Sequence, residues 1–141
     1  MAADTEQLGG YYGDPRSIPV QALMGLTVLQ TGPSAVVTME LTDAVRGSGQ
    51  GTVHGGLLAT FADIASAVSL YGTYDLNVEI PVTTDMHIRY YRQPKGGPLK
   101  GEGNLVHQGR RLLSSECVIT DAEERVLARS TATYMLAPRP V

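Results

Sequence analysis

The stretch HGGLLATFADIASAVSLY, residues 54–71, decides the fold of this chain. Its apolar side chains fall on nearly every face of a helix, and a helix of that kind lies in a protein core. Gly72 follows the stretch and is expected to end the helix. A membrane-spanning helix needs about 20 apolar residues, and this shorter stretch also carries a charged residue, Asp63. The sequence therefore predicts one long helix inside a globular protein.

The segments on both sides of this helix have the patterns of β-strands. Two precede it, at 24–31 and 35–41, with a Gly-Pro-Ser turn between them that indicates a hairpin. A short helix with Ser17 as its N-cap is expected before them. Four strands follow the long helix and are expected at 82–91, 99–107, 112–120 and 126–136. In the first of these four, alternation places Val82, Thr84, Met86, Ile88 and Tyr90 on one face and Thr83, Asp85, His87, Arg89 and Tyr91 on the other.

The order of these elements predicts the fold class. A sheet of two strands followed by a four-stranded meander has an apolar face that must be covered. Helix 54–71 is the only long element able to cover it. We therefore expect an α+β protein with the hotdog fold, a curled antiparallel sheet wrapped around one long central helix. Residues 16–141 would form this single domain, and the glycine-rich residues 1–15 would form a flexible N-terminal arm.

The composition and the motifs exclude several classes of protein. The net charge of −3 argues against general affinity for nucleic acid, and neither a signal peptide nor a membrane-spanning segment is recognisable. Cys117 is the only cysteine, which excludes an intramolecular disulfide and suits a reducing compartment such as the cytoplasm. The sequence lacks the spacings typical of metal sites, phosphate-binding loops and nucleophile elbows. We therefore expect no metal and no cofactor.

Asp63 is the residue most indicative of function. It is the only acidic or basic residue between His54 and Tyr74, in the middle of the most apolar segment. Burying an unpaired carboxylate costs on the order of several kcal/mol, and carboxylates in such settings mark functional sites. The structural alternative is that Asp63 lies on an exposed edge of the helix or pairs with an arginine.

A glycine pair, Gly55 and Gly56, opens the same helix. Glycine costs a helix roughly 1 kcal/mol per residue relative to alanine. In return it gives close access to backbone N–H groups at the positive end of the helix dipole. Such groups can hold the oxyanion that develops during acyl transfer. An ordinary glycine-rich loop leading into a helix would give the same pattern.

In combination, these features resemble the hotdog-fold acyl-CoA thioesterases of the phenylacetate-pathway (PaaI) type and the related human thioesterase-superfamily enzymes. The resemblance extends over residues 47–134. It rests on GTVHGG at 51–56, AD at 62–63, TTDMHIRYY at 83–91, QGR at 108–110 and ARS at 128–130. It implies an enzyme that hydrolyses an acyl-CoA thioester, with an aryl or a medium-chain acyl group, to the free acid and CoA.

The resemblance also implies roles for individual residues. Asp63 matches the catalytic carboxylate, which acts as a nucleophile or as a general base on water. Gly55 matches the residue whose N–H polarises the thioester carbonyl, and His54 matches a histidine beside that carbonyl. Thr83 matches a serine or threonine that helps to position water.

Ser48 departs from the family pattern. Six residues before the histidine these enzymes usually carry Asn, and here Ser48 offers a shorter hydrogen-bond donor, with Gln50 as a possible substitute. This departure keeps open a second reading, a non-catalytic acyl-CoA-binding hotdog protein. A hotdog hydratase acting on enoyl-CoA would carry a D-x-N-P-x-H segment, which this sequence lacks.

The spacing of Gly55 and Asp63 bears on assembly. They are eight residues apart on one helix, which is about 12 Å. A nucleophile and an oxyanion donor must each lie about 3 Å from the same carbonyl group. Each site would therefore take Asp63 from one subunit and Gly55 from another. We expect a homodimer, or a homotetramer formed by two dimers.

Basic residues concentrate in the second half of the chain, where six of the 11 lie between positions 89 and 111. CoA carries phosphates, which the planar arginine side chain binds well. The residues expected to bind CoA are Arg89, Arg92, Arg110 and Arg111. Solvated strand edges and turns would explain any single one of them equally well.

Overall fold

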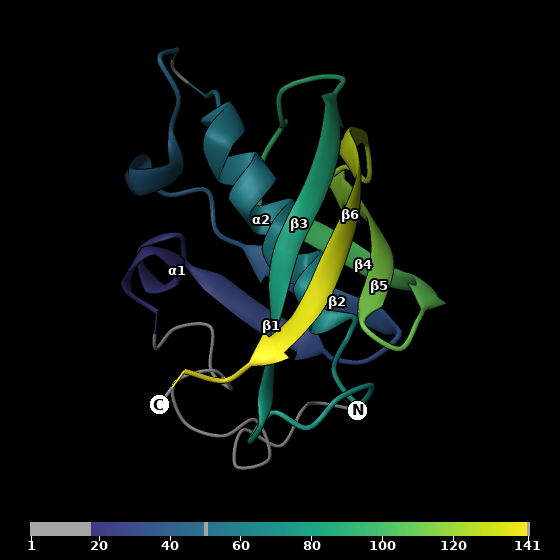
Figure 1. The fold of residues 1–141 in the computed structure, drawn as a ribbon. Coiled ribbons are helices and arrows are strands. Elements are labelled where there is room, and N and C mark those ends of the chain that lie inside the picture. Colours follow the sequence, from purple (N-terminus) through teal and green to yellow (C-terminus); the bar gives the residue numbers. More distant parts are fainter. Residues whose placement is uncertain (1–17, 50, 141) are drawn as a thin grey trace.

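The computed structural model describes residues 18–49 and 51–140, which form one curled sheet and one long helix (Figure 1). The long helix is α2, Gly55–Val68, and two short helices precede it, α1, Pro19–Leu23, and the 3-10 helix η3, Asp43–Val45. The strands are β1 Leu26–Gln30, β2 Ser34–Met39, β3 Glu79–Tyr90, β4 Leu99–Gln108, β5 Leu112–Thr120 and β6 Val126–Pro138. The expected arm 1–15 and Ser17 lie outside the described residues. Helix α1 follows Ile18, whose side chain forms no capping hydrogen bond.

The sheet is antiparallel throughout, in the order β1-β2-β4-β5-β6-β3. It curls around α2, which lies against its concave face (Figure 1). The predicted hotdog fold is therefore confirmed. One detail differs from the prediction, because only β4, β5 and β6 form a meander. Since β2 and β5 already occupy both edges of β4, strand β3 pairs with β6 at the far edge of the sheet.

Helix α2 packs closely on the sheet because glycines of β4 face it. A Cβ atom on Gly103 would collide with the carbonyl oxygen of Ala65, and one on Gly101 would lie 3.1 Å from the ring of Phe61. Phe61 and Ala65 are fully buried. The helix therefore occupies the core, as its apolar sequence predicts. No helix in the described part of the chain is long and apolar enough to cross a membrane.

Helix α2 ends earlier than the sequence predicts. Its C-cap is Ser69, and Gly72, at a φ of 96°, lies in the turn beyond. The Ser69 hydroxyl donates to the carbonyl oxygen of Ser66 at 2.6 Å and lies 2.7 Å from the hydroxyl of Ser115 in β5. A serine that bonds backbone groups of its own helix competes with further helical turns. The helix therefore stops at Val68, one turn before Gly72.

A β-bulge in β3 changes the face on which Thr83 lies. Thr83 pairs with Tyr134 of β6, and Asp85 pairs with the residue before Tyr134, so Thr84 is an extra residue in β3. Strict alternation would place Thr83 and Met86 on opposite faces of β3, but the bulge places both on the face that packs against α2. The predicted alternation is therefore wrong at this point, and the error concerns a predicted site residue.

Candidate active site

The Asp63 carboxylate is half-buried where α2 meets β3 and β6. The hydroxyl of Thr83 donates to its Oδ1 atom at 2.9 Å, and the hydroxyl of Tyr134 lies 2.7 Å from the same atom. The Tyr134 hydroxyl also lies 2.9 Å from the main-chain carbonyl oxygen of Asp63. Its single proton serves one acceptor at a time, and the shorter distance favours the carboxylate. Two strands thus hold one carboxylate oxygen in place.

The second carboxylate oxygen of Asp63, Oδ2, has no hydrogen-bond partner in the described part of the chain. No lysine or arginine of residues 18–49 and 51–140 forms an ion pair with this carboxylate. The structural alternative of an arginine partner is therefore wrong for these residues. A carboxylate oriented through one oxygen and unpartnered at the other is suited to attack a carbonyl carbon or to take a proton from water.

The Tyr134 side chain is a fixed donor rather than a base. It is only 1% exposed and packs with Leu70, Leu113 and Ala132. Its burial, together with the negative charge of Asp63, raises the pKa of its phenol. The hydroxyl therefore keeps its proton and continues to orient the carboxylate across the physiological pH range.

The N-terminal end of α2 is exposed and carries the other predicted groups. His54 is the N-cap, and its Nδ1 atom accepts a hydrogen bond from the N–H of Gly56 at 3.1 Å, which assigns the proton of the neutral ring to Nε2. The carbonyl oxygen of Gly55 accepts from the Tyr90 hydroxyl at 2.7 Å. The N–H of Gly55 donates to no described residue. Gly55 thus offers a free backbone donor on a residue that β3 anchors.

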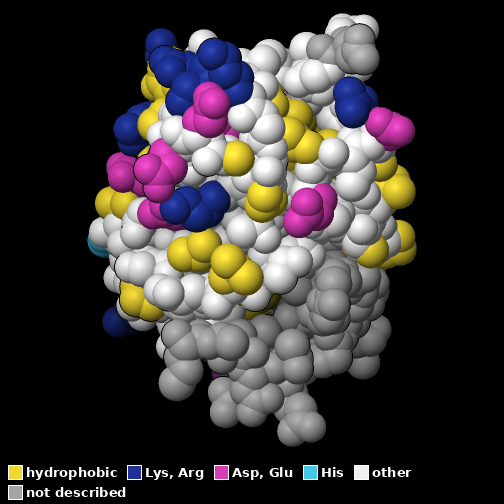
Figure 2. Space-filling model, turned by 180° about the vertical axis from the view of Figure 1, so that it is seen from behind, with side chains coloured by type: hydrophobic (Ala, Val, Ile, Leu, Met, Phe, Trp, Pro, Cys, Tyr) yellow, Lys and Arg dark blue, Asp and Glu magenta, His cyan; other side chains and the backbone are white. Residues whose placement is uncertain are grey.

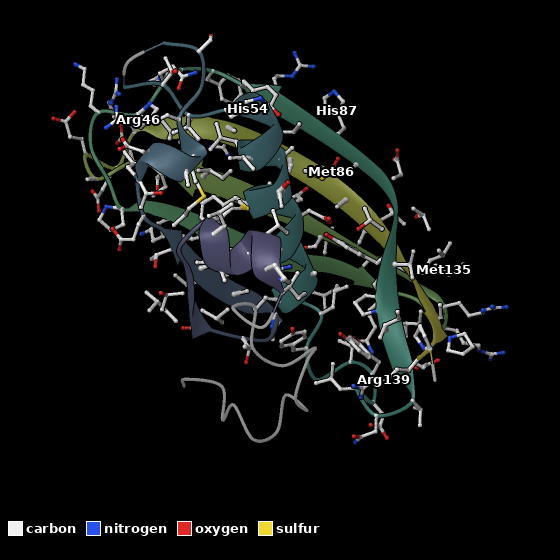
Figure 3. All side chains as sticks on the ribbon, turned by 90° about the vertical axis from the view of Figure 1, so that its left-hand side faces the viewer. Arg46, His54, Met86, His87, Met135 and Arg139 are labelled. Atoms are coloured by element: carbon white, nitrogen blue, oxygen red, sulfur yellow. The ribbon has the colours of Figure 1, made fainter. Side chains whose placement is uncertain are left out.

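The predicted site residues form two separate groups within the protomer. Asp63 lies with Thr83, and His54 lies with Gly55, eight residues away on the same helix and therefore about 12 Å distant along its axis. In Figure 3, His54 lies at one end of α2. Met135 follows Tyr134, the residue that binds Asp63, and lies far from His54 in this view. Neither group combines a carboxylate with a free backbone donor.

Ser48 lies in an exposed turn on the Gly55 side of the molecule. The N–H of Gly47 donates to the carbonyl oxygen of Thr52 at 3.1 Å, and the N–H of His54 donates to that of Val45 at 2.9 Å, so the chain around Ser48 is held to the segment that leads into α2. The structure thus places Ser48 with the N-terminal group of α2, and Gln50 lies outside the described residues.

The arginines predicted to bind CoA fall into two pairs at opposite ends of the sheet, and all four are exposed. Arg89 and Arg92 lie at the end of β3 nearest the start of α2. Tyr90, the residue after Arg89, points toward α2, so the Arg89 side chain lies on the outer face of the sheet. Arg110 and Arg111 lie in the turn between β4 and β5, where the Arg111 carbonyl oxygen accepts from the N–H of Leu136 at 3.0 Å. Figure 2 shows basic side chains mixed with acidic ones on the face it presents. Within one protomer, the four arginines therefore do not form a single cluster.

Sequence reasoning does not identify two tyrosines that complete these groups. Tyr134 binds Asp63 across 71 positions of sequence, and Tyr90 binds Gly55 across 35. The available signal concerns Tyr134 alone, because it is buried on a strand, where a hydroxyl needs a partner; Tyr90 is 47% exposed and gives no such signal. Only the observed strand pairing identifies that partner.

Comparison with protein families decides the family of this chain. Residues 50–128, more than half of the sequence, match the family described as the thioesterase superfamily. The chain belongs to the thioesterase superfamily. The resemblance seen in the sequence is therefore confirmed at the level of the family, and this membership supports thioester hydrolysis as the general activity. A search of curated proteins gives no match.

Solved structures share the fold of this thioesterase-superfamily protein. A thioesterase from Haemophilus influenzae is 16% identical, with a TM-score of 0.82 over 98% of this chain and 93% of its own. A variant of a thioesterase from Pseudomonas aeruginosa is 16% identical, with a TM-score of 0.83 over 99% and 97% of the two chains. A Streptococcus mutans protein bound to acetyl-CoA is 24% identical, with a TM-score of 0.70 over 82% and 91%. At these identities the likeness establishes the fold.

Proposed function

We propose that this protein is an acyl-CoA thioesterase that hydrolyses its substrate to a free acid and CoA. The observation that carries the proposal is the Asp63 carboxylate, held at Oδ1 by Thr83 and Tyr134 and without a partner in the described chain at Oδ2. Membership in the thioesterase superfamily supports the reaction class. The acetyl-CoA bound to the Streptococcus mutans relative supports CoA as the carrier of the acyl group.

The complete site lies between two protomers. The Gly55 N–H and the Asp63 carboxylate are too far apart on one helix to act on the same carbonyl group. Two α2 helices packed antiparallel across a two-fold axis would bring Gly55 of one protomer beside Asp63 of the other, and the axis would create two such sites. The functional unit is therefore a homodimer, alone or within a tetramer.

The Asp63 Oδ2 atom has two possible tasks in this site. As a nucleophile, it attacks the thioester carbonyl carbon, the C–S bond breaks, CoA leaves as a thiolate that takes up a proton, and water then hydrolyses the resulting anhydride. As a general base, it removes a proton from water, the water oxygen attacks the carbonyl carbon, the C–S bond breaks, and the CoA thiolate takes up the proton. In both cases negative charge develops on the carbonyl oxygen, where the free N–H of Gly55 can stabilise it.

The dimer also provides a reason for the two separated arginine pairs. When Gly55 of one protomer lies beside Asp63 of the other, one end of the first protomer's sheet lies near the opposite end of the second protomer's sheet. Arg92 of one protomer and Arg110 and Arg111 of the other then lie on the same side as the shared site. We assign these exposed residues to the CoA phosphates, with Arg89 as an outer contact.

The experiment that tests this function is the Asp63→Asn substitution, assayed by release of free CoA thiol from aryl and medium-chain acyl-CoA thioesters. Asparagine keeps an oxygen that accepts from Thr83 and Tyr134 but removes the charge. We expect the turnover number to fall by about two orders of magnitude or more, the scale of losing a positioned base, while the thermal midpoint changes little.

The matched control is Asp85→Asn, because Asp85 is an exposed aspartate on β3, and this variant should keep wild-type turnover. Near-normal turnover in a folded Asp63→Asn protein would reject Asp63 as the catalytic carboxylate. A wild-type protein that binds acyl-CoA but releases no thiol from any thioester would instead establish the non-catalytic alternative.

A further inference from the structure

The segment that leads into α2 is bound on one side by the chain that precedes it. Val53 forms an isolated antiparallel bridge with Arg46, and the N–H of His54 donates to the carbonyl oxygen of Val45 at 2.9 Å. In such a bridge the flanking N–H groups make the hydrogen bonds, so the N–H of Val53 itself points to the other side. Val53 is only 3% exposed. Its N–H therefore needs an acceptor from another part of the chain.

Gln93 supplies that acceptor. Its side-chain Oε1 atom accepts from the N–H of Val53 at 2.9 Å, across 40 positions of sequence. Gln93 lies in the segment that follows β3, which passes beside the start of α2 (Figure 1). Pro94 comes next and restricts the backbone of Gln93 to extended conformations. A side chain on a restricted segment thus binds the chain two residues before Gly55.

The segment that carries Gln93 is held in turn by Arg125 and Asp121. The Nη2 atom of Arg125 donates to the carbonyl oxygen of Gln93 at 3.0 Å, and its Nε atom donates to Oδ2 of Asp121 at 3.0 Å. Asp121 is 4% exposed and also accepts from the N–H of Lys95 at 2.9 Å. Hydrogen bonds that involve charged groups are the stronger ones. The buried carboxylate therefore fixes the guanidinium, and the guanidinium fixes Gln93.

The free N–H of Gly55 lies between two bound parts of the backbone. Gln93 binds the peptide group that joins Thr52 to Val53, and Tyr90 binds the carbonyl oxygen of Gly55, which belongs to the peptide group after the free donor. The direction of the donor therefore depends on both contacts. A displacement of about 1 Å in a reacting arrangement can lower the rate on the order of 10²-fold.

We propose that Gln93 is a positioning residue of the active site, which orients the Gly55 N–H through Val53 and is itself held by Arg125 and Asp121. The inference rests on the proposed thioesterase function, in which this N–H stabilises the oxyanion. Gln93 does not contact the reacting atoms in this role. It acts only through the backbone that leads into α2.

The substitution that tests this role is Gln93→Met, because methionine keeps the length of the side chain but lacks the carbonyl acceptor. We expect kcat for acyl-CoA hydrolysis to fall by about tenfold, less than for a deleted donor, because the N–H is displaced and not removed. KM should stay within about twofold of the wild-type value, since the lost interaction is one made in the transition state.

A double-mutant cycle with Gly55→Pro separates positioning from a merely structural role. Gly55→Pro has already lost the N–H that Gln93 would orient, so adding Gln93→Met should lower its kcat by less than about twofold. A structural role predicts the same loss in both backgrounds. If Gln93→Met does not fold, Arg125→Lys takes its place in the cycle, because lysine keeps the charge beside Asp121 but lacks the planar fork that also reaches Gln93.

The matched control is Gln30→Met. Gln30 lies on β1, at the edge of the sheet opposite β3, and its side-chain amide likewise binds one backbone group, the carbonyl oxygen of Ser34. This variant should keep the wild-type kcat and KM. An unchanged kcat in a folded Gln93→Met protein, or an equal loss with and without the Gly55 N–H, would overturn the inference.

Failure of the proposed function gives a different result, in which the wild type hydrolyses no thioester. The amide resonance of Gly55 in two-dimensional NMR spectra then decides the inference, since the orientation of the backbone does not depend on turnover. It should shift in Gln93→Met and stay in place in Gln30→Met. A Gly55 resonance that does not move in Gln93→Met would overturn the inference.

Discussion

The beginning and the middle of helix α2 contribute to chemistry in opposite ways. At its beginning, Gly55 is exposed and offers a backbone N–H, and its carbonyl oxygen is bound by Tyr90. In its middle, Asp63 is half-buried and offers a side-chain carboxylate, which Thr83 and Tyr134 hold. One region stabilises negative charge and the other supplies it. The difference explains why a single protomer is not sufficient for the proposed reaction.

The largest effect expected at the beginning of the helix follows from removing the Gly55 N–H. Gly55→Pro deletes this donor, and proline is tolerated at the first position of a helix. The residue before a proline must be extended, and His54 already is, with φ of −61° and ψ of 126°. We expect the turnover number to fall by about 10²–10³-fold, the scale of losing one oxyanion donor, with the fold retained.

Gly55→Ala is the control for that prediction because it keeps the N–H. A Cβ atom there would lie 3.8 Å from the ring of Tyr90, an ordinary contact. Turnover should therefore stay close to that of the wild type. If Gly55→Pro and Gly55→Ala hydrolyse acyl-CoA equally fast, the beginning of α2 has no catalytic role, and the comparison between the two regions fails.

A smaller effect should separate the two tyrosines that anchor these regions. Tyr134→Phe removes a donor to the Asp63 carboxylate, and we expect turnover to fall by about tenfold, the scale of about 1.4 kcal/mol. Tyr90→Phe removes only a hydrogen bond to the Gly55 carbonyl oxygen, so it should lower stability by about 1 kcal/mol and change turnover less. Turnover and thermal midpoint of both variants test this order. A larger loss of turnover in Tyr90→Phe would reverse it.

Some of this account could be predicted from the sequence because it is local. The apolar run of α2, the glycine pair at its start and the isolated Asp63 all lie within one segment. Because one apolar helix and a set of strands have few ways to bury each other, the fold also follows from local patterns.

The partners of Asp63 could not be predicted, because they depend on strand pairing. Tyr134 reaches the carboxylate only because β3 and β6 lie side by side at the edge of the sheet, and Thr83 only because of the bulge at Thr84. A bulge shifts side chains by one position and leaves no clear mark in the alternation of a strand. The free N–H of Gly55 likewise depends on the chain path before α2.

The central claim is that each active site combines Asp63 of one protomer with Gly55 of another, and mixed oligomers test it most directly. Asp63→Asn and Gly55→Pro subunits are co-expressed with different tags, and the mixed dimers are purified. In such a dimer one site carries both defects and the other carries neither.

The account predicts that the purified mixed dimer regains about half of the wild-type turnover per dimer, although each parent variant is nearly inactive, because one of its two sites is intact. Size-exclusion chromatography with light scattering confirms that the measured species contains both subunits. A mixed dimer as inactive as the two parents would show that Asp63 and Gly55 do not act together across the interface, and would contradict the account.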